Sequence, residues 1–159
     1  MPAGGRMAES EAQRATAFQA LAEQHLLASY RLANAILGNE AESQDAVHDA
    51  FVRAWQRWDS LRDRAVFQHW FDRIVVNTCR DRQRRAARRP TTAISPQIAL
   101  STPDPTAEVH RRLVVAQAFE RLKPDDVEVL ALRFFLDLEI EDIASLLDIP
   151  TPTAKTRLR

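Results

Sequence analysis

The stretch EIEDIASLLDIPTPTAKTRLR, residues 139–159, decides the fold of the C-terminal part of this sequence. Its apolar residues recur at helical spacing and predict a short helix over about 140–147. Residues 148–150 then predict a tight turn. Thr151 as a cap, followed by Pro152 at the first helical position, predicts that a second helix starts there. Two helices joined by so short a turn are typical of a helix-turn-helix motif.

The second helix of such a motif enters the major groove of duplex DNA, where its exposed side chains reach phosphates and base edges. Three polar residues lie near the start of that helix and are the candidates for DNA contact: Lys155, Thr156 and Arg157. The pattern alone leaves a second interpretation open, in which the two helices form a hairpin that only packs.

A second basic element, RDRQRRAARR, occupies residues 80–89 and holds six arginines and one aspartate. The whole chain has 22 basic and 22 acidic side chains, so the rest of it is net acidic. A patch of one sign on an otherwise acidic chain favours a polyanionic partner such as nucleic acid or a membrane surface, and leaves acidic surface for a basic partner. The alternative is a solvated helix end.

The arginines continue a helix that begins near Phe67, because apolar residues recur at helical spacing from there to Thr78. We therefore expect the first half of this helix to be held in a core and the arginines to project from it rather than pack. Spacings of three and four place four polar side chains along one side of the helix: Asn77, Arg80, Arg84 and Arg88.

The rest of the sequence predicts an all-α protein of two small domains. One helix should end at Gly38, and a second, capped by Asn39, should run to about residue 58. Further helices should start at Asp104–Pro105 and at Pro124, after a Pro-rich linker. The expected parts are a disordered leader (1–12), a helical domain (13–89), the linker (90–104) and a helix-turn-helix domain (105–159).

Aromatic residues are concentrated between residues 51 and 71, where nucleic-acid stacking and core packing are competing interpretations. Their helical spacing favours the core for four of them: Phe51, Trp55, Phe67 and Phe71.

Composition and motifs argue against catalysis, a metal site and membrane insertion. The spacing of Asp45, His48 and Asp49 suits metal ligands, but the further carboxylate and histidine ligands of a di-iron bundle are not found on other stripes. No nucleophile lies in a recognisable catalytic frame, so we expect no enzyme, cofactor or metal. A single cysteine, the absence of a long apolar run and the absence of an apolar leader predict a cytoplasmic protein.

Four strings together resemble one family: AESQDAVHDAFVRAW, FQHWFDRIVVNTCRDRQRR, DPTAEVHRRLVVAQAFERLKP and LALRFFLDLEIEDIASLLDIPTPTAKTRLR. In this order they resemble the bacterial group 4, or extracytoplasmic-function (ECF), sigma factors, over residues 18–159 apart from the linker. The resemblance implies a sigma region 2-like helical bundle and a sigma region 4-like helix-turn-helix joined by the Pro-rich linker. Members usually extend the last helix by a turn or more beyond the position of Arg159, so a truncation or a missing tail is expected.

The resemblance also implies a function, that of a transcription initiation subunit. Its partners would be core RNA polymerase (β′ and β subunits), promoter DNA and an anti-sigma factor. The implied polymerase-binding residues are Asp45, His48, Asp49, Phe51 and Arg53. The loop around 59–66 and the helix carrying Asn77 and Arg80 would open and read the minus-ten element, while Arg82, Arg84 and Arg85 would lie along the DNA backbone. Lys155, Thr156 and Arg157 would contact the minus-thirty-five element.

Two other functions fit parts of the pattern. A stand-alone helix-turn-helix regulator would bind duplex DNA tightly without polymerase. A helical adaptor would have no nucleic-acid role, and its arginine run would be a solvated face.

Overall fold

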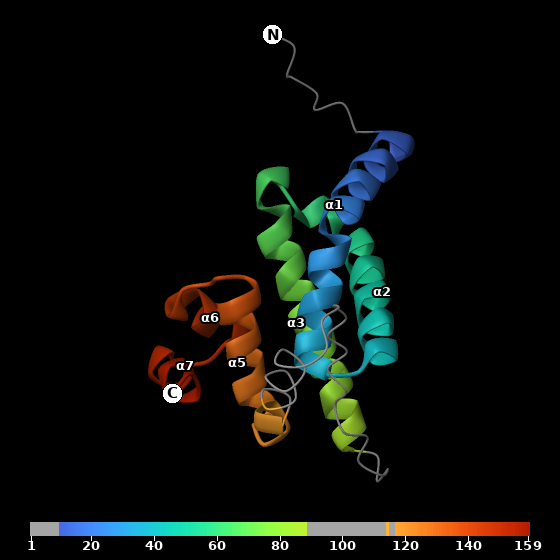
Figure 1. The fold of residues 1–159 in the computed structure, drawn as a ribbon. Coiled ribbons are helices and arrows are strands. Elements are labelled where there is room, and N and C mark those ends of the chain that lie inside the picture. Colours follow the sequence, from blue (N-terminus) through green and yellow to red (C-terminus); the bar gives the residue numbers. More distant parts are fainter. Residues whose placement is uncertain (1–9, 89–113, 115–116) are drawn as a thin grey trace.

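The computed structural model describes residues 10–88, 114 and 117–159, and within them it contains helices and no strand (Figure 1). The expectation of an all-α fold is confirmed. Residues 1–9 of the expected leader, the linker and the first part of the helix expected from Asp104 lie outside the described residues; residues 114 and 117–120 of that helix are described and helical. The helices are α1 (Glu11–Leu37), α2 (Glu40–Gln56), α3 (Phe67–Ala87), α5 (Pro124–Phe135), α6 (Ile140–Leu147) and α7 (Thr151–Arg157). Two 3-10 turns, Trp58–Ser60 and Arg64–Val66, connect α2 to α3.

Local capping residues set the ends of the first two helices; Gly38 and Asn39 do so as the sequence predicts, whereas α1 begins at Glu11, inside the expected leader. Ser10 and Gln13 form a capping box at the start of α1, each side chain accepting from the other's backbone N–H. Gly38 ends α1 with a φ of 64°, a left-handed conformation that glycine adopts without a steric penalty. The Asn39 side chain then accepts from the Glu42 N–H and starts α2.

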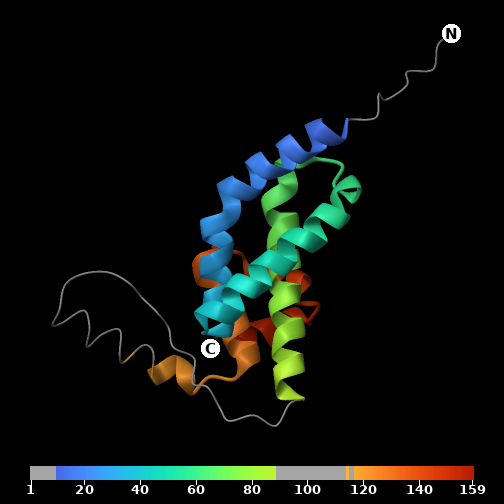
Figure 2. The same cartoon turned by 90° about the vertical axis from the view of Figure 1, so that its right-hand side faces the viewer.

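Helices α1, α2 and α3 surround an aromatic core, and Figure 2 shows α2 lying diagonally across the other two. Phe67 and Phe71 are buried, with their rings stacked 5.4 Å apart. Phe51 is partly buried and packs against this cluster, and the partly buried Trp55 contacts the edge of the Phe18 ring at 5.3 Å. The interpretation as core is confirmed for Phe51, Phe67 and Phe71, and Trp58 joins them at 4% exposure. Trp55 lies at the edge of the core, where the Arg14 guanidinium covers its ring.

Helices α5, α6 and α7 form the helix-turn-helix half. Asp148 ends α6 with a φ of 54°, so it makes the predicted turn in a left-handed conformation that Asp tolerates better than most residues. The expected cap of α7 is wrong by one residue. Pro150 is the N-cap, with no side-chain hydrogen bond, and Thr151 is already helical. Pro152 still lies in the first turn, where its missing N–H has no helical partner to lose.

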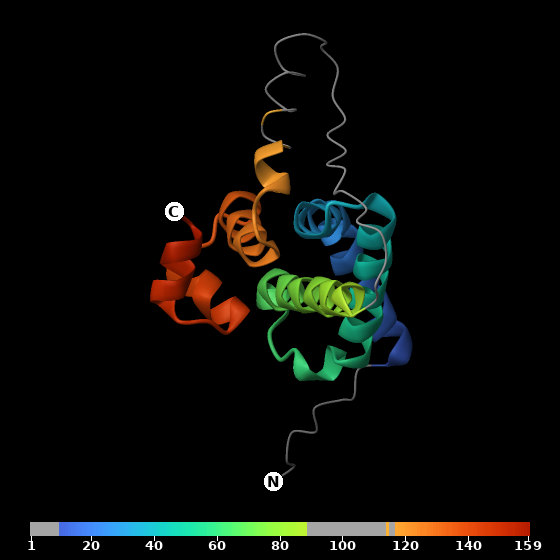
Figure 3. The same ribbon diagram turned by 90° about the horizontal axis from the view of Figure 1, so that it is seen from below.

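The two halves pack against each other. Figures 1 and 3 show α3 with the C-terminal helices on one side of it and α2 on the other. One buried apolar cluster runs through both halves, from Leu32 in α1 to Leu147 in α6. The Arg73 Nη2 donates to the Ser145 carbonyl at 3.3 Å and adds a polar contact between α3 and α6. The two halves therefore share a core in this conformation.

Candidate nucleic-acid interface

The arginine run of α3 divides according to what each side chain contacts, and its first member lies between the two halves. The Arg80 Nε is 3.5 Å from the Glu128 Oε2 on α5. Its Nη1 donates to the Leu147 carbonyl at the end of α6, at 3.1 Å. The expectation that the arginines project rather than pack is wrong for Arg80, because a buried carboxylate and a helix-terminal carbonyl hold its guanidinium. Its contact with DNA stays a prediction.

Glu128 is the buried charged group opposite Arg80. Its side chain is 3% exposed, and its Oε2 accepts no hydrogen bond. Burial raises the pKa of Glu128 from 4.5 to about 7, and the nearby carboxylate of Asp125 raises it further, while Arg80, Arg157 and Arg84 act in the opposite direction. Because burial outweighs the cations, the pair with Arg80 does not fully compensate the carboxylate for its lost hydration.

Arg82 contacts the acidic face of α2. Its Nη1 lies 2.8 Å from the Glu42 Oε2, and its Nη2 lies 2.8 Å from the Asp49 Oδ2. Asp45 is 4.0 Å from the same guanidinium. Burial by itself lowers the pKa of Arg82, but the hydrogen bonds to Asp49 and Glu42 outweigh it and the net shift is upward. The expectation of a projecting side chain is therefore wrong for Arg82 as well.

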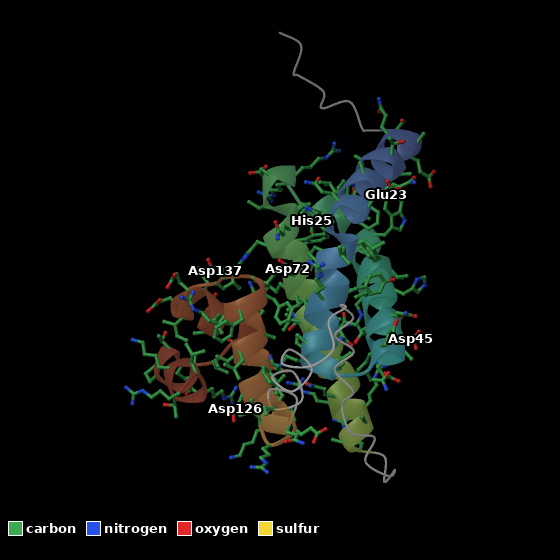
Figure 4. All side chains as sticks on the ribbon, in the orientation of Figure 1. Glu23, His25, Asp45, Asp72, Asp126 and Asp137 are labelled. Carbon is green, nitrogen blue, oxygen red and sulfur yellow. The ribbon has the colours of Figure 1, made fainter. Side chains whose placement is uncertain are left out.

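A second ion pair joins the same two helices, because the Arg53 Nη1 lies 2.9 Å from the Asp81 Oδ2. Asp45, Asp49 and Arg53 thus lie on one outer surface of α2, and Figure 4 shows Asp45 on the side away from the C-terminal helices. His48 is exposed on this helix. Phe51 is turned inward, with its ring stacked on Phe71 at 4.5 Å.

Some polar side chains in the C-terminal half of α3 make no ion pair with α2 or α5 and are exposed. Asn77, Arg84 and Arg85 are exposed, as is Arg88 beyond the end of the helix. Asn77 and Arg84 are seven residues apart, two helical turns, and so lie on the same side. Of the four residues predicted to line this side, Arg80 alone is partly covered.

The candidate DNA-contacting residues of the helix-turn-helix also divide into exposed and paired side chains. Lys155 and Thr156 are exposed on α7. Arg157 is 22% exposed because its Nη2 donates to the Asp125 Oδ2 on α5 at 2.7 Å. The core beneath these residues consists of Ile143, Leu146, Leu147 and Ala154, all buried.

The loop between α2 and α3 is held at its first end. The Arg14 Nη2 on α1 is 3.0 Å from the Asp59 Oδ1, and its guanidinium lies over the Trp55 ring at 5.4 Å. The Arg64 guanidinium lies over the ring of the buried Trp58 at 5.5 Å. Sequence reasoning missed these contacts, as it missed Glu42, Asp81 and Glu128.

Among residues 10–88 and the described part of the C-terminal half, no group of three or more His, Cys, Asp or Glu side chains is arranged so that it could hold a metal ion. No helix in the same residues is long and apolar enough to cross a membrane.

Comparison with known proteins decides the family. Residues 21–89 match sigma-70 region 2 and residues 112–159 match sigma-70 region 4. The chain is 30% identical, over 162 residues, to the ECF RNA polymerase sigma factor SigM of Mycobacterium tuberculosis, covering 97% of this chain and 82% of the relative. The chain belongs to the ECF sigma factors. It is thus a transcription initiation factor that binds core RNA polymerase and directs promoter recognition, and the resemblance seen in its sequence is confirmed.

Other relatives of this ECF sigma factor agree with that assignment. It is 27% identical to SigL of Mycobacterium tuberculosis, covering 96% of this chain and 89% of the relative. Among solved structures, that of CnrH in complex with the cytosolic domain of CnrY matches at a TM-score of 0.57 and 25% identity, over 91% of this chain and 86% of that one. The sigma factor RpoE of Bartonella quintana, solved with the anti-sigma factor NepR, shares the fold at a TM-score of 0.62 and 20% identity, over 88% and 90% of the two chains.

Proposed function

We propose that this ECF sigma factor docks on core RNA polymerase through the outer face of α2, and reads promoter DNA with the exposed part of α3 and with α7. The observation that supports this division is the separation of charge on α2 and α3. Carboxylates gather on the outer face of α2, whereas the exposed cations Arg84 and Arg85 lie further along α3.

The docking face consists of Asp45, His48, Asp49 and Arg53. Asp45 and Asp49 keep side-chain exposures of 69% and 43%, so a basic surface of the polymerase can reach them. By the family resemblance that surface is the coiled coil of the β′ subunit. Phe51 supports the helix from behind through its stacking on Phe71.

On α3, Asn77 reads bases of the minus-ten element, and Arg84 and Arg85 bind backbone phosphates. Phosphate contacts fix the position of the protein on DNA without reading sequence, whereas an amide side chain can discriminate between bases. Arg80 joins this surface when it is released from Glu128 and from the Leu147 carbonyl.

On α7, Lys155 and Thr156 contact the minus-thirty-five element as duplex DNA. Arg157 assists from the same helix, either by leaving Asp125 or by sharing its guanidinium with a phosphate. Two weak reading surfaces on one chain bind well together, because the second contact forms at a high effective concentration.

The activity takes place in the cytoplasm with the polymerase, under the control of an anti-sigma factor. Two solved structures resemble this chain: CnrH, in complex with the cytosolic domain of CnrY, and RpoE, with its anti-sigma factor. The partner of this chain would cover the docking face, the DNA-reading helices or both.

The test is transcription in vitro on genomic fragments with core RNA polymerase, followed by mapping of the transcript starts. Starts at a specific set of promoters should appear only when this chain is present. Asp45→Asn combined with Asp49→Asn should weaken that activity, and Glu23→Gln, on an exposed site of α1, should leave it unchanged. An unchanged set of starts with and without the chain would contradict the proposal.

A gel shift with the chain and promoter DNA alone separates the proposal from a stand-alone regulator. The sigma factor should bind the isolated duplex poorly. Tight binding without polymerase would favour the stand-alone regulator instead.

A further inference from the structure

We propose that Arg82 is a positioning residue of the polymerase-docking face of α2, and not a contact to DNA. This inference rests on the proposed docking role of that face. It assigns Arg82 to a different surface from Arg84 and Arg85, although the three arginines lie within four positions of one helix.

The contacts of Arg82 already occupy both ends of its guanidinium. The Nη1 lies 2.8 Å from one carboxylate (Glu42) and the Nη2 lies 2.8 Å from another (Asp49). The Nε is buried and has no hydrogen-bond partner. With its side chain 21% exposed, Arg82 has little surface left for a phosphate, whereas Arg84 and Arg85 are exposed.

The acidic face needs such a cation to hold its shape. Glu42, Asp45 and Asp49 lie at spacings of three and four on α2, so their charges repel one another along one side of the helix. The planar guanidinium of an arginine binds two carboxylates at once, and the single ammonium group of a lysine does so less well. Arg82 thereby fixes Glu42 and Asp49 and leaves Asp45, which lies between them, as the most exposed of the three carboxylates at 69%.

Pre-ordering of these carboxylates reduces the entropy that is lost when the polymerase binds. Side chains that are already fixed lose little rotamer freedom on association, and affinity rises without any new contact. The Arg53–Asp81 pair at 2.9 Å joins the same two helices near this site and holds α2 and α3 in register while Arg82 orders the carboxylates.

The test measures binding of the full chain to core RNA polymerase in the absence of DNA, by fluorescence anisotropy of a labelled chain. Arg82→Gln should weaken this binding about tenfold, since two carboxylates must then be ordered during association. The affinity of Arg82→Lys for core RNA polymerase should lie between that of Arg82→Gln and that of the unchanged chain. The matched control, Arg85→Gln, removes an exposed arginine of the same helix and should leave core binding unchanged.

A second measurement distinguishes positioning from mere stabilisation of the fold. When Glu42→Gln and Asp49→Asn are already present, adding Arg82→Gln should have no further effect on core binding. In the complete holoenzyme, Arg85→Gln should reduce the salt slope of promoter binding by about 1, and Arg82→Gln should leave that slope unchanged.

Unchanged core binding by Arg82→Gln together with a shallower salt slope would overturn the inference and make Arg82 a DNA contact, while the proposed function would stand. Failure of the unsubstituted chain to bind core polymerase would overturn the proposed function and the inference with it. An unfolded Arg82→Gln variant is detected by circular dichroism, and the comparison then uses Arg82→Lys.

Discussion

Replacement of Glu128 by glutamine should strengthen the packing of the two halves at neutral and alkaline pH. The carboxylate is buried between α5 and α3, with Arg80 3.5 Å away and no hydrogen bond to its Oε2. Glutamine keeps the shape of the side chain and removes the charge. The expected gain follows from the protonation equilibrium of the native glutamic acid.

Burial raises the pKa of Glu128 from 4.5 to about 7, so the folded state binds the proton more tightly than the unfolded state. Its contribution to stability is complete below pH 4.5, is lost as the pH rises towards 7, and stays lost above 7. A difference of 2.5 between the two pKa values corresponds to about 3 kcal/mol. Glu128→Gln should therefore raise the free energy of unfolding by about 3 kcal/mol at pH 8 and by about 1 kcal/mol or less at pH 5.

The charged groups that face Glu128 all remain in the variant. They are Arg80 and Arg84 from α3, Asp125 from α5 and Arg157 from α7. The negative charge of Glu128 also raises the pKa of Cys79 on α3.

Urea unfolding of both chains at several pH values between 5 and 8 measures the effect. Asp72, whose pKa burial raises to about 6, contributes its own pH dependence in the same window. The difference between the two chains is therefore the quantity to compare. Glu23→Gln, the same substitution on an exposed part of α1, should show no pH-dependent difference.

A variant less stable than the native chain at pH 8 would refute the reasoning. That result would mean that attraction to Arg80 exceeds the loss of hydration, and that the ion pair holds the halves together. A difference that does not change with pH would mean that Glu128 stays ionised throughout the range.

Three further results are expected. Alanine at both Arg84 and Arg85 should reduce the salt slope of polymerase-dependent promoter binding by about 2, since each exposed cation meets one phosphate. Filter binding should also show that promoters of different sequence lose the same affinity, and an unchanged slope would contradict the prediction. Cys79 should resist alkylation at pH 8 until the chain unfolds, because burial raises the pKa of its thiol to about 12; rapid labelling of the folded chain would contradict this. Asp148→Val should lower the free energy of unfolding by about 1–2 kcal/mol, and Asp148→Gly should be nearly neutral, because a β-branched residue is strained at a φ of 54°.

The helix ends were predictable because their signals are local. Gly38 and Asn39 stop one helix and cap the next within two residues, and Pro124 opens α5. The turn at Asp148 follows from the short interval between two apolar stripes. The start of α7 was placed one residue late, since Thr151 has the chemistry of a cap while Pro150 has the extended backbone of one.

The candidate site was predictable only in part, because its ion pairs join residues far apart in the chain. Asn77, Arg84, Arg85, Lys155 and Thr156 are exposed, as their helix positions suggested. The covering of Arg80 depends on how α5 packs on α3, and helical periodicity carries no information about that packing.

Two signals in the sequence nevertheless pointed to the partly covered Arg82 and the buried Glu128. Arg82 lies three residues after Cys79 and seven after Val75, so it continues the stripe that both of those buried residues define. Glu128 lies four residues before the buried Leu132 and thus falls on the core side of its helix. A charged residue on an apolar stripe predicts a partner on the facing helix, because a buried charge without one is strongly disfavoured.

Arg80 cannot both hold the two halves together and bind DNA. The Leu147 carbonyl accepts a hydrogen bond from the Arg80 Nη1 and the Glu128 carboxylate lies 3.5 Å from its Nε, so the two groups take the place that phosphate oxygens would otherwise occupy. Arg73 donates to the Ser145 carbonyl of α6, so a joint movement of α5 and α6 away from α3 would free both cations. Ionisation of Glu128 favours that movement and protonation opposes it, because the buried carboxyl group holds its proton up to about pH 7.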